Sequence, residues 1–155
     1  MAAPRSAEQR KSDTLAKLAE RGADVWVATA ARGADAAGEP YLVPLSLAWI
    51  DERVVIALEA SSRTARNLAS GGTARLALGP TRDVVVIDAV TDGIVPIDER
   101  AGHLAVRYVE QADWDPRTAG DGYVLIAFRP IRIQAWREAN EIAGRTLMRD
   151  GTWLV

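Results

Sequence analysis

The chain reads VVIALEA followed by SSRTARNL from Val54 to Leu68, and this joins an apolar strand to a polar helix start. Hydroxyl and guanidinium groups crowd the point where the strand turns into a helix. Free N–H groups at a helix start favour an anion, and each charge-assisted hydrogen bond from a side chain would add roughly 1.5–3 kcal/mol. The stretch therefore predicts a phosphate pocket that anchors a cofactor. Its candidate binding residues are Ala60, Ser61, Ser62, Arg63, Thr64, Arg66 and Asn67.

Helix capping is the simpler interpretation of the same residues. In that case Ser62 only caps the helix, while Arg63 and Arg66 face solvent. Capping needs a single side chain, whereas two arginines and three hydroxyls gather at this helix start. Phosphate binding is therefore favoured, with capping kept as the alternative.

Upstream of this stretch the pattern predicts a helix and an antiparallel meander. Apolar residues recur at helical spacing over residues 6–21, and Gly22 ends that helix. Alternating apolar residues then predict three consecutive strands. These strands are expected at 24–31, 41–50 and 54–60, with turns at 33–38 and 51–53.

Downstream the chain alternates further strands with helices. The expected elements are a helix at 64–70, strands at 73–78 and 83–90, a helix at 97–111 and a long strand at 123–136. Thr91-Asp92-Gly93 is expected to close the β-branched strand 83–90, which should be central in the sheet. Pro130 predicts a bulge or an edge in the long strand. Two short apolar pieces follow, joined at 149–151. Six or more short strands with helices between them predict a mainly β fold, a compact barrel with helical decorations.

Composition excludes several classes of site. The 155 residues indicate one domain without an internal repeat or linker. The chain has no cysteine and a single histidine, so thiolate zinc sites, iron–sulfur clusters and multi-histidine metal sites are excluded from within it. A net charge of -2 argues against a nucleic-acid partner held by bulk electrostatics. No signal peptide or membrane span is visible, so we expect a cytoplasmic protein. The sequence also lacks G-x-G-x-x-G, P-loop, G-x-S-x-G and H-E-x-x-H motifs.

A second candidate segment is Val43-Pro44-Leu45-Ser46, which places a proline inside an otherwise good strand. A proline breaks ladder pairing and leaves nearby backbone groups available for a planar ligand. An ordinary edge strand explains the segment equally well. Trp136-Arg137, at the end of the long strand, could stack on an aromatic ring system and hydrogen-bond to it.

Other conspicuous residues are expected to have structural roles. Most of the five tryptophans should make core or dimer contacts. His103 should be a surface or half-buried helix residue. Glu138 and Glu141 are expected to be solvated loop carboxylates, so no side chain is assigned as a catalytic acid or base.

The order of these elements, with SRTARNL at 62–68 and DVVVIDA at 83–89, resembles the pyridoxamine 5'-phosphate oxidase-like FMN-binding split-barrel superfamily. Within it the chain looks like the flavin/deazaflavin oxidoreductases that use coenzyme F-420. The likeness covers most of residues 24–136. It implies a six-stranded split β-barrel that forms a homodimer, with a cofactor site at the subunit interface. In that scheme residues 1–22 form an N-terminal helix, 24–136 the barrel core and 137–155 a C-terminal segment of one domain.

The resemblance also implies roles for individual residues. Ser62, Arg63 and Thr64 match the positions that grip the cofactor phosphate in the family. Threonine in place of the family's frequent lysine argues against oxidation of pyridoxamine phosphate. The strand 42–47 would lie along the cofactor ring, with the backbone of Val43 to Ser46 facing it. Trp136 and Arg137 would approach from the partner subunit.

The expected function is therefore hydride transfer to a small organic substrate with coenzyme F-420, the first choice, or FMN. The chemistry would belong to the cofactor ring, and the protein would supply position and electrostatics. Arg5, Arg10 and Lys11 are expected to meet the acidic tail of F-420. A non-catalytic binder of a flavin, a deazaflavin or a tetrapyrrole (heme, biliverdin) is the alternative.

Overall fold

The computed structural model describes residues 1–31, 33 and 37–155 of the chain. The turn expected at 33–38 includes residues that lie outside this description. The β-strands are β1 (Asp24–Ala30), β2 (Pro40–Ile50), β3 (Arg53–Glu59), β4 (Thr73–Leu78), β5 (Val84–Pro96), β6 (Tyr123–Trp136), β7 (Thr146–Arg149) and β8 (Thr152–Trp153). The helices are α1 (Ala7–Ala19), α2 (Arg63–Leu68) and α3 (Gly102–Ala112), with 3-10 turns η1 (Pro116–Thr118) and η2 (Ala139–Gly144).

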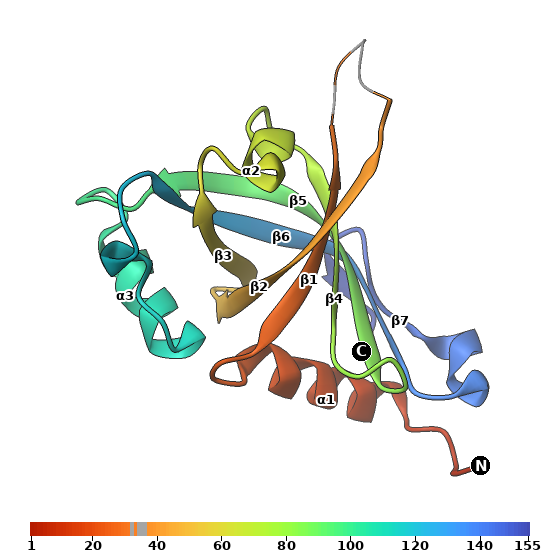
Figure 1. Cartoon of the computed structure of the whole chain (residues 1–155). Coiled ribbons are helices and arrows are strands. Elements are labelled where there is room, and N and C mark those ends of the chain that lie inside the picture. The colour runs from red at the N-terminus through yellow and green to blue at the C-terminus, as the bar shows by residue number, and fades with distance from the viewer. Residues whose placement is uncertain (32, 34–36) are drawn as a thin grey trace.

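The strands form an antiparallel sheet that closes on itself (Figure 1). Their order is β3-β2-β1-β4-β5-β6, and a second pairing between β3 and β6 closes the six-stranded barrel. The strands β7 and β8 extend the sheet beyond β6. This confirms the predicted barrel, the meander of β1, β2 and β3, and the central position of the strand predicted at 83–90.

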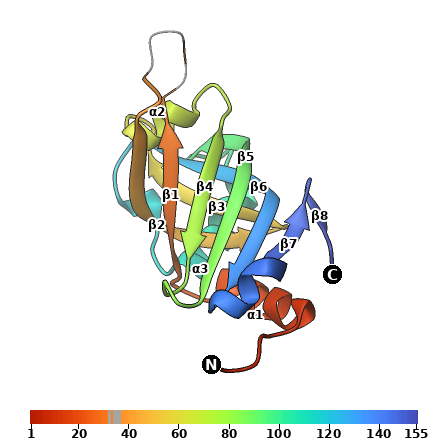
Figure 2. The same ribbon diagram turned by 90° about the vertical axis from the view of Figure 1, so that its right-hand side faces the viewer.

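Alternating side chains decide which face of each strand is buried. In β1, Val25 and Val27 are buried inside the barrel, whereas Trp26 between them is 49% exposed. Leu18 of α1 and Leu68 of α2 join the same core. These two helices lie at opposite ends of the barrel, as Figures 1 and 2 show. A smaller apolar cluster packs α3 against β2 and β3 and includes the fully buried Tyr108.

One predicted strand end is wrong. Thr91-Asp92-Gly93 does not close β5, which continues to Pro96 beside β6. Between the pairs Thr91–Phe128 and Ile94–Ile126 the register shifts, so that Asp92 and Gly93 form a bulge opposite one residue of β6. A bulge absorbs a turn-like sequence without ending the strand. As a result, α3 begins at Gly102 instead of residue 97.

The bulge predicted at Pro130 is confirmed. Asp88 pairs with Arg132 and Ala89 pairs with Pro130, so Ile131 is the extra residue of β6. No helix among the described residues is long and apolar enough to span a membrane.

Candidate functional site

The helix start predicted as a phosphate pocket is built by α2. Ser62 caps it, because its hydroxyl accepts a hydrogen bond from the Ala65 N–H at 3.2 Å. Arg63 and Arg66 are exposed, as the capping interpretation expects, and exposure is also what a ligand requires. The helix has only six residues. Its dipole is therefore short, and any anion would depend on side chains rather than on the helix end.

Two of the predicted binding residues point into the protein. Thr64 is 1% exposed and Asn67 is 8% exposed. The Asn67 amide Nδ2 donates a hydrogen bond to the Thr29 hydroxyl at 3.0 Å, which fastens α2 to β1. This differs from the predicted role of both side chains in ligand contact. Of the residues predicted to bind here, Ala60, Ser61, Arg63 and Arg66 are exposed and Ser62 is partly exposed.

Arg63 connects α2 to the start of β2. Its guanidinium lies over the ring of Tyr41, 4.7 Å from the ring centroid. Its Nη2 is 3.3 Å from a carboxylate oxygen of Glu39. The Arg63 side chain is 42% exposed and that of Glu39 is 72% exposed, so the ion pair is open to solvent. The Tyr41 ring orients the guanidinium, and Glu39 is an anion that any bound phosphate would have to compete with.

The segment of β2 from Leu42 to Ser46 has an open edge. The N–H of Leu47 donates to the Ala23 carbonyl at 3.0 Å, so Leu47, Leu45 and Val43 direct their backbone groups towards β1. By alternation, the backbone groups of Leu42, Pro44 and Ser46 point the other way. The strand β3 pairs with β2 only from Leu47 onwards, so no described strand covers this edge.

Pro44 fits this arrangement because it has no N–H to leave unpaired at the open edge. Its side chain and that of Leu42 are exposed on the outer face, while Val43 and Leu45 pack against the barrel core. The edge-strand interpretation is therefore correct. The same geometry leaves the Leu42 N–H and the Pro44 carbonyl directed away from β1, where a planar ligand could bind them.

Trp136 and Arg137 lie at the opposite end of β6 from α2, because Trp136 pairs with Val84 at the start of β5, whereas Tyr123 at the other end of β6 pairs with Glu59, just before α2. The Arg137 N–H donates to Glu141 at 2.8 Å, and its Nε lies 3.3 Å from Asp83. The guanidinium of Arg145 covers the Trp136 ring at 5.5 Å. Within one chain the structure does not bring these two residues to the other predicted site residues.

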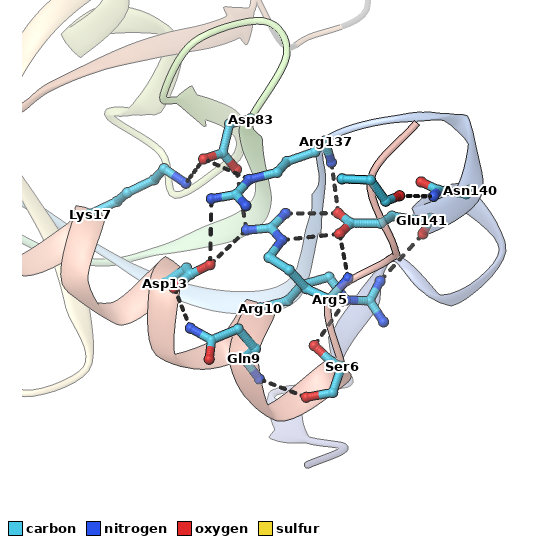
Figure 3. Close-up of polar contacts among 11 residues, drawn as sticks. Arg5, Ser6, Gln9, Arg10, Asp13, Lys17, Asp83, Arg137, Asn140 and Glu141 are labelled. Carbon is cyan, nitrogen blue, oxygen red and sulfur yellow. Dashed lines mark hydrogen bonds and ion pairs between the residues drawn. The ribbon is translucent and has the colours of Figure 1, made fainter.

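Arg5 and Arg10 are turned inwards, which contradicts their predicted contact with a cofactor tail, whereas Lys11 is partly exposed. Figure 3 shows Arg5 between Glu141 and Asp13, with its Nη atoms 2.8 Å from each carboxylate. Arg10 is 7% exposed and donates to the Glu141 carbonyl. Lys11 lies over the Trp153 ring at 4.8 Å. These cations are already bound by groups of the chain itself.

Glu141 is the residue that the sequence interpretation missed. It is 4% exposed instead of solvated. Hydrogen bonds from the Arg5 side chain, opposed by burial and aided by the backbone N–H groups of Arg5 and Arg137, lower the pKa of Glu141 to about 2. This cluster ties the N-terminus to η2. No local sequence pattern indicates that Glu141 is buried, because its partner Arg5 lies 136 residues away in the chain.

A groove of about 480 Å³ lies over small residues at the outer face of β1 and β4. Ala28, Ala30 and Thr73 line it, and the ion pair between Arg75 and Asp88 (2.7 Å) lies at its side. None of the predicted site residues lines this groove.

His103 is exposed on α3, as predicted. Among the residues that the structure describes, no group of three or more metal-binding side chains comes together.

No protein-family model and no curated protein matches the chain. Several solved structures match it. An F-420 reductase superposes with a TM-score of 0.60 at 18% identity, over 76% of this chain and 94% of the other. A heme binding protein from Mycobacterium smegmatis gives a TM-score of 0.67 at 15% identity, over 97% of this chain and 60% of the other. A FAD-binding protein from Mesorhizobium loti gives a TM-score of 0.60 at 15% identity, over 84% of this chain and 94% of the other.

These likenesses, with the closed strand order, decide the fold. The chain has the split β-barrel fold of these structures, the fold implied by its resemblance to the pyridoxamine 5'-phosphate oxidase-like superfamily. Proteins named for F-420, heme and FAD share this split barrel, so its ligand has to be argued from the residues of this chain.

Proposed function

We propose that this split barrel is an oxidoreductase that binds coenzyme F-420, the first choice, or FMN, and uses it to reduce or oxidise a small organic substrate. The observation that carries the proposal is the exposed Arg63 guanidinium, oriented by the Tyr41 ring beside the open edge of β2. Structural neighbours named as an F-420 reductase and a FAD-binding protein support a flavin-type ligand.

The donor set fits a phosphate. Arg63 and Arg66 offer guanidinium groups with several N–H donors, and Ser61 adds an exposed hydroxyl next to them. A phosphate would displace the Glu39 carboxylate from Arg63, which costs little because exposed ion pairs are weak. The phosphate end of the ligand would therefore lie at α2.

The ring of the cofactor would lie along β2. The Leu42 N–H and the Pro44 carbonyl would hydrogen-bond its polar edge and fix its orientation, while the apolar side chains of Val43 and Leu45 support the strand from the core side. When bound, either cofactor supplies the hydride chemistry. The residues of the chain bind the ring, orient it and exclude water around it. No side chain has to gain or lose a proton.

We also propose that two copies associate through the outer face of β1 and β2. Trp26 is 49% exposed and Leu42 is 57% exposed, and Pro44 pairs directly across from Trp26. Apolar side chains gathered on one face favour an interaction surface. A homodimer formed there would allow Trp136 and Arg137 of one subunit to approach the ring bound to the other.

Light scattering tests the dimer. Leu42→Glu is expected to reduce the mass in solution from that of two chains to that of one, because it introduces a charge into the interface. Val106→Glu is the matched control, since Val106 is 42% exposed but lies on α3. A monomeric wild-type protein, or a dimer that Leu42→Glu leaves intact, would contradict the proposed interface.

Turnover tests the enzymatic part of the proposal. Reduced F-420 and reduced FMN are each mixed with the protein and a panel of small organic acceptors, and the oxidation of the cofactor is followed by absorbance. Oxidation that depends on protein and on one acceptor supports an oxidoreductase. Tight binding without turnover for any acceptor would leave a binding protein instead.

A tetrapyrrole-binding protein is the second candidate. The heme binding neighbour, with a TM-score of 0.67 over 97% of this chain, favours it. That function predicts a shift of the heme Soret band on mixing and no binding of F-420 or FMN.

A further inference from the structure

A side chain of α3 forms a hydrogen bond with Ser46, the last residue of the open edge of β2. The hydroxyl of Tyr108 donates a hydrogen bond to the Ser46 carbonyl at 3.0 Å. Ser46 lies where the barrel splits, because the pairing of β2 with β3 ends at Leu47 and Ile56. The Tyr108 hydroxyl therefore lies at the fork between the two strands.

The hydroxyl is itself fixed in place. Tyr108 is fully buried, and the Trp114 Nε1–H donates to its oxygen at 3.2 Å. The two rings meet edge to face, 6.4 Å between centroids, and Trp114 meets Tyr123 in the same way at 5.9 Å. Burial raises the pKa of Tyr108 to about 12, opposed by the Trp114 N–H and the Ala57 backbone N–H, so the hydroxyl keeps its proton at neutral pH.

The segment that Tyr108 holds is bonded to strands on one side only. Residues 40–46 of β2 pair with β1, and no described strand covers their other edge. A strand supported on one side opens locally more easily than one in the middle of a sheet. A buried, immobile donor on the open side is thus a tether for this segment.

We propose that Tyr108 is a positioning residue that, by tethering Ser46, holds the open edge of β2 in the conformation that receives the ligand. The ligand part of this inference rests on the proposed function, in which the cofactor ring lies along that edge. The tether itself is a property of the chain without ligand.

Amide hydrogen exchange tests the tether in the ligand-free protein. Tyr108→Phe removes the hydroxyl and keeps the ring. We expect the amides of Val43 and Leu45 to exchange at least tenfold faster in this variant, while the amide of Leu76 in β4, an internal reference for global stability, changes less. Equal changes at all three amides, or none, would overturn the tether.

Tyr123→Phe is the matched control. Tyr123 belongs to the same aromatic cluster, and its hydroxyl makes no hydrogen bond among the described residues. This variant should leave the exchange of Val43 and Leu45 unchanged. Acceleration equal to that in Tyr108→Phe would show that the Ser46 contact is not the cause.

Ligand titration tests the positioning role. Both variants are titrated with F-420 and FMN at a temperature where each is fully folded by circular dichroism. We expect Tyr108→Phe to bind at least tenfold more weakly and Tyr123→Phe to bind like the wild type. Unchanged affinity in Tyr108→Phe would overturn the positioning role and leave the proposed function intact. A wild-type protein that binds neither ligand would overturn the proposed function and the positioning role together, and the exchange result would then decide the tether alone.

Discussion

Arg5 and Glu141, 136 residues apart in the chain, are joined by three hydrogen bonds. The Arg5 Nε and Nη2 reach the two carboxylate oxygens at 3.0 and 2.8 Å, and the Arg5 backbone N–H adds a contact of 2.8 Å. Both side chains are buried, at 9% and 3% exposed. This pair locks the N-terminal segment onto η2, so the ends of the chain contribute to one structure.

Glu141→Ala should destabilise the protein strongly. It leaves a buried guanidinium with only Asp13 and Asp83 as partners, and breaking a buried ion pair costs about 3 kcal/mol. Chemical unfolding measures the loss. Glu138→Ala removes the exposed partner of Arg82 and should change stability little. Equal effects of the two substitutions would contradict the role given to Glu141.

The free energy of unfolding should fall as the pH is lowered below the pKa of an ordinary glutamate side chain. The pKa of Glu141 in the folded protein is about 2, against 4.5 for an unperturbed glutamate carboxyl. A lowered folded-state pKa means that the stabilisation is complete above about pH 4.5 and is lost as the pH falls towards 2. Hydrogen bonding to Arg5 also lowers the pKa of Asp13, which acts in the same direction.

Unfolding free energies at pH 6 and pH 3 measure this effect. Glu141→Gln cannot titrate, so its stability should depend less on pH over this interval than that of the wild type. A variant with the full pH dependence of the wild type would assign the effect to other carboxylates.

Thr14→Val should stabilise the protein. Thr14 is fully buried on α1, and its hydroxyl has no hydrogen-bond partner among the described residues. Valine has nearly the same shape without the polar group, so the gain is about 1 kcal/mol. Thermal unfolding measures it. Thr14→Ser keeps the hydroxyl and loses a methyl group, so it should instead lower the melting temperature.

Glu39→Gln should tighten the binding of a phosphate-bearing cofactor. The Arg63 Nη2 donates a hydrogen bond to the Glu39 carboxylate at 3.3 Å. An exposed ion pair of this kind stabilises by up to about 1 kcal/mol. We therefore expect a gain of up to about fivefold at low ionic strength, shrinking as salt is added. Glu20→Gln, an exposed carboxyl at the end of α1, serves as the control. Weaker binding in Glu39→Gln would indicate that the carboxylate helps to hold Arg63.

The barrel could be predicted because its signals are local. Alternation in residues 24–30 and 40–50, and turns at Asp51 and Asp150, define hairpins within the chain. The end of β5 could not be predicted in this way, because Asp92-Gly93 fits a turn equally well. Only the pairing of β5 with β6 makes these two residues a bulge.

Part of the site was also predictable. The proline at position 44 correctly indicated an edge, and Ser62 a helix start. The burial of Thr64 and Asn67 follows from how α2 packs on β1, which periodicity over six residues cannot reveal. The burial of Arg5 and Glu141 depends on a contact across nearly the whole chain, and Tyr108 looked like any apolar helix residue.

In the proposed function, Arg63 and the open edge of β2 bind a phosphate-bearing cofactor. Parallel titrations of wild type, Arg63→Ala and Arg21→Ala with F-420 and FMN, followed by tryptophan and ligand emission, test it most directly. Arg21 is a control because it is 71% exposed and pairs with Asp113 away from α2. We predict that the wild type and Arg21→Ala bind F-420 tightly and that Arg63→Ala binds at least tenfold more weakly, about 1.4 kcal/mol. Equal affinity of all three proteins, or no binding of either cofactor to the wild type, would contradict a cofactor site at Arg63.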